Sequence, residues 1–186
     1  ISLQQDVKYP FDSDDITIHI TMPYITKMDL AGATEACFIG QFEAPQFTAH
    51  LSGSSEIEDL AIVADEVSIE ASGASELSGT IQAKRAMANL TRASKLDLIV
   101  NQLSQMTMQL SGSSSSELKG AITNLQATLS GASEIDGEEL AVSDLDLSLS
   151  GASSADIRNS GTLRYKLSGA SELTIYGSPR VLDSQS

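Results

Sequence analysis

The chain has little of what several common protein classes need. Its 186 residues include no tryptophan, one cysteine, four prolines, two histidines and only 4% aromatic residues. A lone cysteine excludes an internal disulfide framework. The two histidines, His19 and His50, have no cysteine or histidine partner at ligand spacing, so no zinc site is expected. No apolar run approaches the ~20 residues of a membrane-spanning helix.

Basic residues are also scarce. Eleven lysines and arginines face 25 acidic residues, which gives a net charge of −14. Such a surface repels phosphate backbones and anionic lipids, so we expect no nucleic-acid or membrane-surface binding. Cations, basic partners and neutral glycans stay open as ligands. The single cysteine, Cys37, lies in the apolar stretch 36–39 and is predicted to be a buried, unreactive thiol.

A short phrase recurs through the sequence: Leu-Ser-Gly-Ala/Ser-Ser-Glu-Leu/Ile. It occupies residues 51–57, 71–77, 129–135 and 167–173, with degenerate copies at 30–36 and 90–96. Two further copies, 110–118 and 149–157, read as carrying a two-residue insertion. The central residues fall at positions 32, 53, 73, 92, 112, 131, 151 and 169, in steps of 21, 20, 19, 20, 19, 20 and 18. A period near 20 predicts stacked repeats rather than an ordinary globule.

Apolar and polar residues alternate around each phrase, which is the period of a strand. Positions two, four and six before the glycine are mostly apolar, and the positions between them are mostly polar. Turn signals every few residues leave no room for a helix longer than one turn. The sequence therefore predicts an all-β fold, a single-stranded parallel β-helix (β-solenoid) with about eight coils of ~20 residues. Such a rod would be roughly 35 Å long at the usual strand spacing.

The repeated glycines are predicted to form a structural turn, because a bend between two strands needs positive φ or close backbone approach. They are Gly32, Gly53, Gly73, Gly112, Gly131, Gly151 and Gly169. Arg92 takes this place in the fourth coil, which should bend differently or carry mild strain. Two positions after the glycine, the serines are predicted to form a hydroxyl ladder in which each donates to the next coil: Ser55, Ser75, Ser94, Ser114, Ser133, Ser153 and Ser171.

One domain is expected, in two parts. Residues 1–28 would be a lead-in with a cap strand at 16–20, and residues 29–186 the repeats. The lead-in would cover the open end of the stack and prevent edge-to-edge association.

Three segments carry a family resemblance: the recurring Ser-Gly-Ala-Ser-Glu-Leu, the lead-in 18–24 and the closing 173–181, with its Tyr-Gly-x-Pro. Over roughly residues 16–181 the chain resembles the putative auto-transporter adhesin family, also called the head GIN domain. The resemblance implies a right-handed parallel β-helix on a secreted or surface-anchored protein of a Gram-negative bacterium. It implies an extracytoplasmic location, at the cell surface, outer membrane or periplasm, with the signal peptide outside this chain. It brings no catalytic residues.

Glutamates recur three residues after the glycine, with Glu117 close to that position in a copy read as inserted, and they are predicted to point outward as an acidic ridge: Glu35, Glu56, Glu76, Glu117, Glu134 and Glu172. Lys95 interrupts the row and relieves part of its repulsion. The ridge is either a solvated edge or a surface that recruits Ca²⁺ or a basic partner. The Gly-Gly-x-Gly-x-Asp turn of calcium-binding β-rolls is missing, so a calcium site would be loose and weak. No cofactor or dedicated metal site is predicted.

Parallel β-helices also include pectinase-like enzymes, which need carboxylates on neighbouring coils of one face. The acid pairs Asp65/Glu66, Glu138/Glu139 and Asp144/Asp146 are candidates, but Ala86, Met106 and Gln126 are expected near their register, and no base is expected to join two acids in one column. No Gly-x-Ser-x-Gly elbow is present. We therefore predict a non-enzymatic, adhesin-like module for surface binding or display, with a glycan or protein ligand. A pectinase-like enzyme and a structural spacer are the alternatives.

Overall fold

The computed structural model describes residues 18–185, and these contain strands, turns and bends but no helix. Among them, therefore, no helix has the length and apolarity needed to cross a membrane. The strands are β1 (Lys27–Leu30), β2 (Glu35–Cys37), β3 (Phe42–Leu51), β4 (Glu56–Gly73), β5 (Glu76–Arg92), β6 (Lys95–Leu110), β7 (Ser115–Leu129), β8 (Glu134–Leu149), β9 (Ser154–Leu167), β10 (Glu172–Tyr176) and β11 (Arg180–Gln185).

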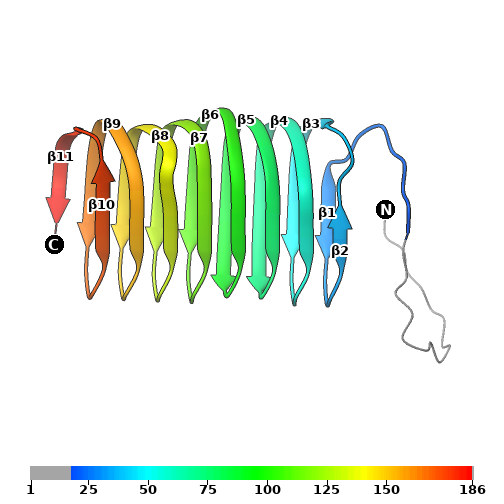
Figure 1. The fold of residues 1–186 in the computed structure, drawn as a ribbon, viewed down its shortest axis with the longest axis horizontal. Coiled ribbons are helices and arrows are strands. Elements are labelled where there is room, and N and C mark those ends of the chain that lie inside the picture. Colours follow the sequence, from blue (N-terminus) through cyan, green and yellow to red (C-terminus); the bar gives the residue numbers. More distant parts are fainter. Residues whose placement is uncertain (1–17, 186) are drawn as a thin grey trace.

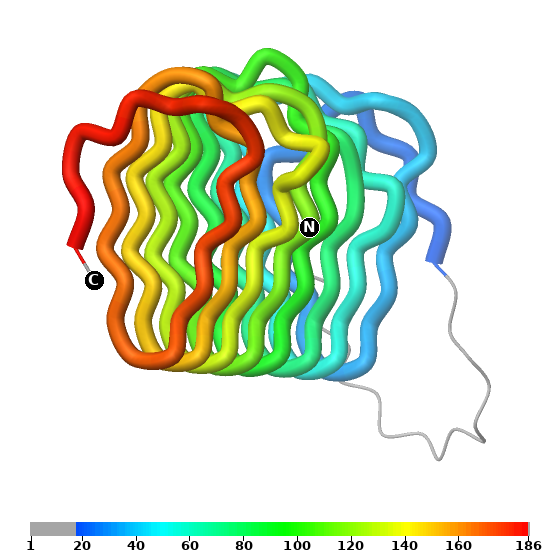
Figure 2. Tube along the Cα trace, turned by 60° about the vertical axis from the view of Figure 1, so that its left-hand side comes forward, coloured from blue at the N-terminus to red at the C-terminus, as the bar shows by residue number. Residues whose placement is uncertain are grey.

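All strand pairs are parallel, and each strand pairs with its counterpart about 20 residues away. In Figure 1 each long strand rises from a tight turn, bends over the top of the rod and descends to the next turn. Figure 2 shows these turns aligned along one edge. We call the part of a coil after each turn the rising segment and the part before the next turn the falling segment. The predicted parallel β-solenoid of about eight coils is confirmed.

The core forms because alternate residues of both segments point inward. In β4, for example, Ile57, Leu60, Ile62, Val67 and Ile69 are each at most 2% exposed. Along the rod, large and small side chains alternate in one inward row, in the order Ile69, Ala88, Met108, Ala127 and Leu147. Such alternation lets neighbouring coils interdigitate at strand spacing, and Phe47, at 1% exposure, is the one aromatic side chain fully buried among the described residues.

The glycine turns carry both features that the sequence predicts. At Gly131 φ is 80°, and an added Cβ would lie 2.5 Å from the carbonyl oxygen of Gly112 in the coil below. The amide of Ala132 donates to that same oxygen at 2.7 Å, so the hydrogen-bond ladder continues through the turn. Glycine, which has no Cβ, combines this backbone conformation with this close stacking without strain.

Arg92 adopts the same turn as the glycines. Its φ is 70°, close to the 90° of Gly73 below it and the 83° of Gly112 above it. The prediction that this coil bends differently is therefore wrong. The alternative, mild strain, agrees with the left-handed backbone, because a side chain with a Cβ adopts it at a cost of about 1–2 kcal/mol.

The two predicted insertions are wrong. Ser116 pairs with Leu96 and Ile135, and Ala155 pairs with Ile135, so both stand where other coils have leucine or isoleucine. Both are buried, and the Ser116 hydroxyl donates to the Leu96 carbonyl at 3.0 Å. In both coils this inward residue stays at the same distance in sequence from the turn glycine as in the other coils. Only its side chain is smaller than the usual leucine or isoleucine.

The predicted hydroxyl ladder between coils is also wrong. Each of these serines donates to the carbonyl three residues earlier in its own turn, as Ser133 does to Ser130 at 2.8 Å. Ser55, Ser75, Ser94, Ser114, Ser153 and Ser171 make the same bond. These hydroxyls close the turn locally, as serines commonly do.

The lead-in is only partly described. Ile18 and Ile20 belong to no strand and are 59% and 51% exposed, while Ile25 is buried at the end of the core and Met22 packs against it. Residues 16 and 17 of the predicted cap strand lie outside the described residues. β1 begins at Lys27, so the predicted boundary between residues 28 and 29 falls inside a strand. A capping role for the lead-in stays a prediction.

Candidate functional site

The predicted acidic ridge is one outward row on the rising segments. The register places Glu35, Glu56 and Glu76 side by side, followed by Lys95, Ser115, Glu134, Ser154 and Glu172. Lys95 bonds Glu76 Oε1 at 2.9 Å, as expected for a residue that relieves repulsion. Glu117 is not in this row. It lies two positions further along the coil, and Ser115 holds the place in the row. The prediction put Glu117 in the row because it assumed an insertion that the structure lacks.

Glu117 belongs to a second acidic row that the sequence reading missed. This row also contains Glu58, Asp97, Asp136 and Asp156. It is recognisable in the sequence as the next outward position after the glutamates, once the coils are aligned from the turn. The two rows together form what we call the acidic face. Lys95, in the first row, has its Nζ 2.6 Å from Asp97, and Lys119, in the next outward row, has its Nζ 2.8 Å from Glu117.

Charge is unevenly balanced along the acidic face. Near the first coils, Glu56 and Glu35 raise the pKa of Glu58. Further along, the hydrogen bond from Lys119 lowers the pKa of Glu117. Within residues 18–185, no group of three or more carboxylates, imidazoles or thiols is arranged to hold a metal ion. In this part of the chain the acidic face thus has the charge that attracts cations, without the converging ligands of a calcium site.

Cys37 also lies on this face, which corrects the prediction of a buried thiol. It is exposed, and Ala36 takes the inward position instead. Its Sγ lies 3.9 Å from Asp59 Oδ2. Local desolvation, followed by the charges of Asp59, Glu58 and Glu35, raises the pKa of the thiol. A raised pKa lowers the fraction of reactive thiolate at neutral pH.

The falling segments present a different surface, which we call the polar face. Three outward rows cross it. The first row contains Asp29, His50, Glu70, Asn89, Gln109, Thr128, Ser148 and Lys166. The second row contains Lys27, Thr48, Ser68, Met87, Thr107, Gln126, Asp146 and Arg164. The third row contains Gln46, Glu66, Arg85, Gln105, Asn124, Asp144 and Thr162. Charged groups lie toward the two ends of these rows, and amides and hydroxyls occupy the middle.

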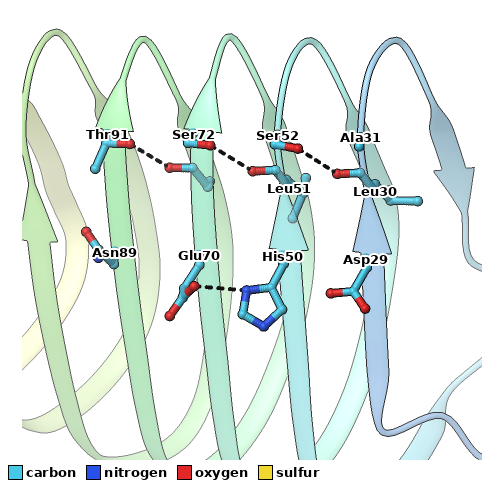
Figure 3. Close-up of a pocket in the computed structure, with 11 residues that line it drawn as sticks. Asp29, Leu30, Ala31, His50, Leu51, Ser52, Glu70, Ser72, Asn89 and Thr91 are labelled. Atoms are coloured by element: carbon cyan, nitrogen blue, oxygen red, sulfur yellow. Dashed lines mark hydrogen bonds and ion pairs between the residues drawn. The ribbon is translucent and has the colours of Figure 1, made fainter.

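A shallow, open depression of about 440 Å³ lies over the first four coils of the polar face. At its centre His50 Nδ1 lies 2.9 Å from Glu70 Oε2, with Asp29 on the opposite side in the same row (Figure 3). Ser52, Ser72 and Thr91 line its upper edge, and their hydroxyls donate to carbonyls of the preceding coil over 3.4–3.5 Å. These long bonds leave the hydroxyl oxygens open as acceptors.

A second depression of about 350 Å³ lies over later coils of the same face. Gln105, Asn124, Gln126, Asp144, Asp146, Thr162 and Arg164 are among its lining residues. Thr162 donates to Asp144, and Asn124 donates to the Ser104 carbonyl at 3.3 Å. Sequence reasoning placed Asp144 and Asp146 as a candidate acid pair with Gln126 near them, but it did not find Gln105 and Asn124.

Two details of the predicted acid pairs need correction. Arg164 pairs in register with Asp146 and with Asp183, so a base does stand between two acids in one row. Of the predicted neighbours, Gln126 stands beside Asp146 on the surface, whereas Ala86 and Met106 point into the core.

The other two predicted acid pairs meet different partners. Asp65 pairs with Lys84, and Glu66 pairs with Arg85. Glu138 accepts a hydrogen bond from the Tyr176 hydroxyl at 2.8 Å.

Comparison with known proteins identifies the family. The model of the family described as "Putative auto-transporter adhesin, head GIN domain" matches residues 2–98 and 76–179, and the chain belongs to this family. No curated protein and no solved structure matches the chain.

Proposed function

We propose that this member of the adhesin-like family is a non-enzymatic binding module displayed on the outside of a Gram-negative cell. The observation that carries the proposal is the arrangement of its outward side chains. They stand in rows along two flat faces, so the rod offers many equivalent, weak contacts. Multivalent contact of this kind raises a weak affinity without a deep pocket.

The site geometry favours binding over the pectinase-like alternative. Both depressions are shallow and open, whereas acid–base catalysis works best where water is excluded. Three of the four carboxylates that line them are already engaged: Asp29 with Lys27, Glu70 with His50 and Asp144 with Thr162. These contacts orient the groups for recognition of a ligand.

The purified protein should be incubated with arrays of glycans and of extracellular proteins, with and without Ca²⁺. Retention of the protein with no released product is the expected result. Release of shortened products from a polysaccharide would contradict a non-enzymatic role. Failure to bind any array or intact cells would favour the structural spacer.

A further inference from the structure

We infer that the polar face is a track for an extended, uncharged polysaccharide lying parallel to the axis of the rod. This rests on the proposed binding function and names its ligand class. The first observation is that the two depressions follow one another along the same face. One spans the coils of Asp29, His50, Glu70 and Asn89, and the other those of Gln105, Asn124, Asp144 and Thr162. The seven steps between eight coils, at about 4.8 Å each, give a continuous length of about 34 Å.

The second observation is the chemistry of the middle of this track. Asn89, Gln105, Gln109, Asn124 and Gln126 supply five amides from three neighbouring coils. Each amide presents a donor and an acceptor side by side, which matches the hydroxyls of a sugar. Thr107 and Thr128 add hydroxyls between them. In these three coils the rows hold one charged side chain, Arg85, which already pairs with Glu66, so a neutral ligand meets no unpaired charge there.

The surroundings argue against other ligand classes. A polyanionic chain would be repelled by a molecule of net charge −14, and a basic partner would prefer the acidic face. Protein partners usually need large aromatic or apolar anchors. In the three described rows of the polar face, Met87 is the one large apolar side chain, 56% exposed. A single flexible methionine suits contact with the C–H surface of a sugar better than it anchors a protein.

The absence of aromatic residues from these rows sets the expected strength of binding. Without stacking on a ring, each sugar unit gains little. Affinity must therefore accumulate along the track, and it should rise with the length of the oligosaccharide until the 34 Å are filled.

The test uses the whole chain with soluble neutral β-glucan, mannan and xylan, oligosaccharides of each from two to eight units, and polygalacturonate as an anionic comparator. We expect at least one neutral series to bind about tenfold more tightly at six units than at two. The double variant Asn124→Ala/Gln126→Ala should lose about tenfold in affinity. The matched variant Ser115→Ala/Ser154→Ala, on the acidic face, should bind as the wild type does. Circular dichroism and thermal melts verify that both variants fold.

Three results would overturn the inference: no retention of any neutral polysaccharide, equal loss in both double variants, or a preference for polygalacturonate. The failure of this inference is distinguishable from failure of the proposed function. Binding to protein arrays or cells without binding to neutral polysaccharides would remove the inference and leave the function. Binding to neither would remove both.

Discussion

Gly73 and Arg92 lie one above the other in adjacent turns and share a left-handed backbone, with φ of 90° and 70°. Glycine adopts this conformation freely, and arginine does so against the clash of its Cβ. The turn geometry is thus imposed by the stack on either side, and Arg92 conforms to it.

Replacing this arginine should stabilise the rod. We expect Arg92→Gly to raise the free energy of unfolding by about 1 kcal/mol and the Tm by about 2–4 °C. Arg92→Ala is the control, since it removes the same charge but keeps the Cβ. An equal gain from Arg92→Ala would show that charge, and not backbone strain, limits stability at this turn.

Close stacking of the turns can be separated from positive φ by comparing two glycines with the same φ of 80°. An added Cβ at Gly32 meets nothing within 4 Å, whereas at Gly131 it would lie 2.5 Å from the Gly112 carbonyl oxygen. Gly32→Ala should cost about 1 kcal/mol from strain alone. Gly131→Ala should cost at least about 1 kcal/mol more, because backbone must move. Equal costs in denaturant melts would contradict the close stacking.

The turn serines should act independently of each other. Ser114→Ala and Ser133→Ala each remove a bond to a carbonyl of their own turn, so each should cost about 1 kcal/mol. The double variant should then lose the sum of the two, within about 0.5 kcal/mol. A coupled ladder across coils would make the double variant depart clearly from that sum.

Repulsion between carboxylates on the acidic face should be detectable in how the Tm depends on pH. Because Glu56 and Glu35 raise the pKa of Glu58, its charged form destabilises the fold at neutral pH, and this penalty disappears as the pH falls through the folded pKa. Glu58→Gln should therefore raise the Tm near pH 7 and change it little below the ordinary glutamate value of 4.5.

Glu117→Gln is the matched variant of opposite sign. Its pKa is lowered by Lys119, so its stabilisation is present above the unfolded pKa and is lost as the pH falls through the folded value. The variant should lower the Tm near pH 7, again with no difference at low pH. If Glu58→Gln and Glu117→Gln shift the Tm near pH 7 in the same direction, this account of the acidic face is contradicted.

The coil, its inward rows and its glycine turns are predictable from the sequence, because strand alternation and a fixed turn repeat together eight times. The errors arise where the phrase changes composition. Ser116 was not recognised as an inward residue because Leu118 completes the phrase better. In the structure the inward position stays at a constant number of residues after the turn. Buried Ser116 can take the place of a leucine there because its hydroxyl donates to the Leu96 carbonyl.

The candidate faces were harder to predict for a different reason. Which side chains meet across coils depends on register, and the register shifts at the top bends, for example between Gln82 and Arg85. The neighbours of Asp146 are therefore not found by counting a constant period. Cys37 was misplaced for a related reason: a short apolar stretch does not tell which of its residues points inward, and here Ala36 does.

Distances along one outward row test the account most directly. Spin labels would be placed at Lys166 and, in turn, at Asn89, Glu70 and His50, in a Cys37→Ser background. These positions lie four, five and six coils from Lys166, so the label distances should be about 19, 24 and 29 Å, rising by about 4.8 Å per coil. Distances that do not increase evenly along this series would contradict the stacked coils and, with them, both faces.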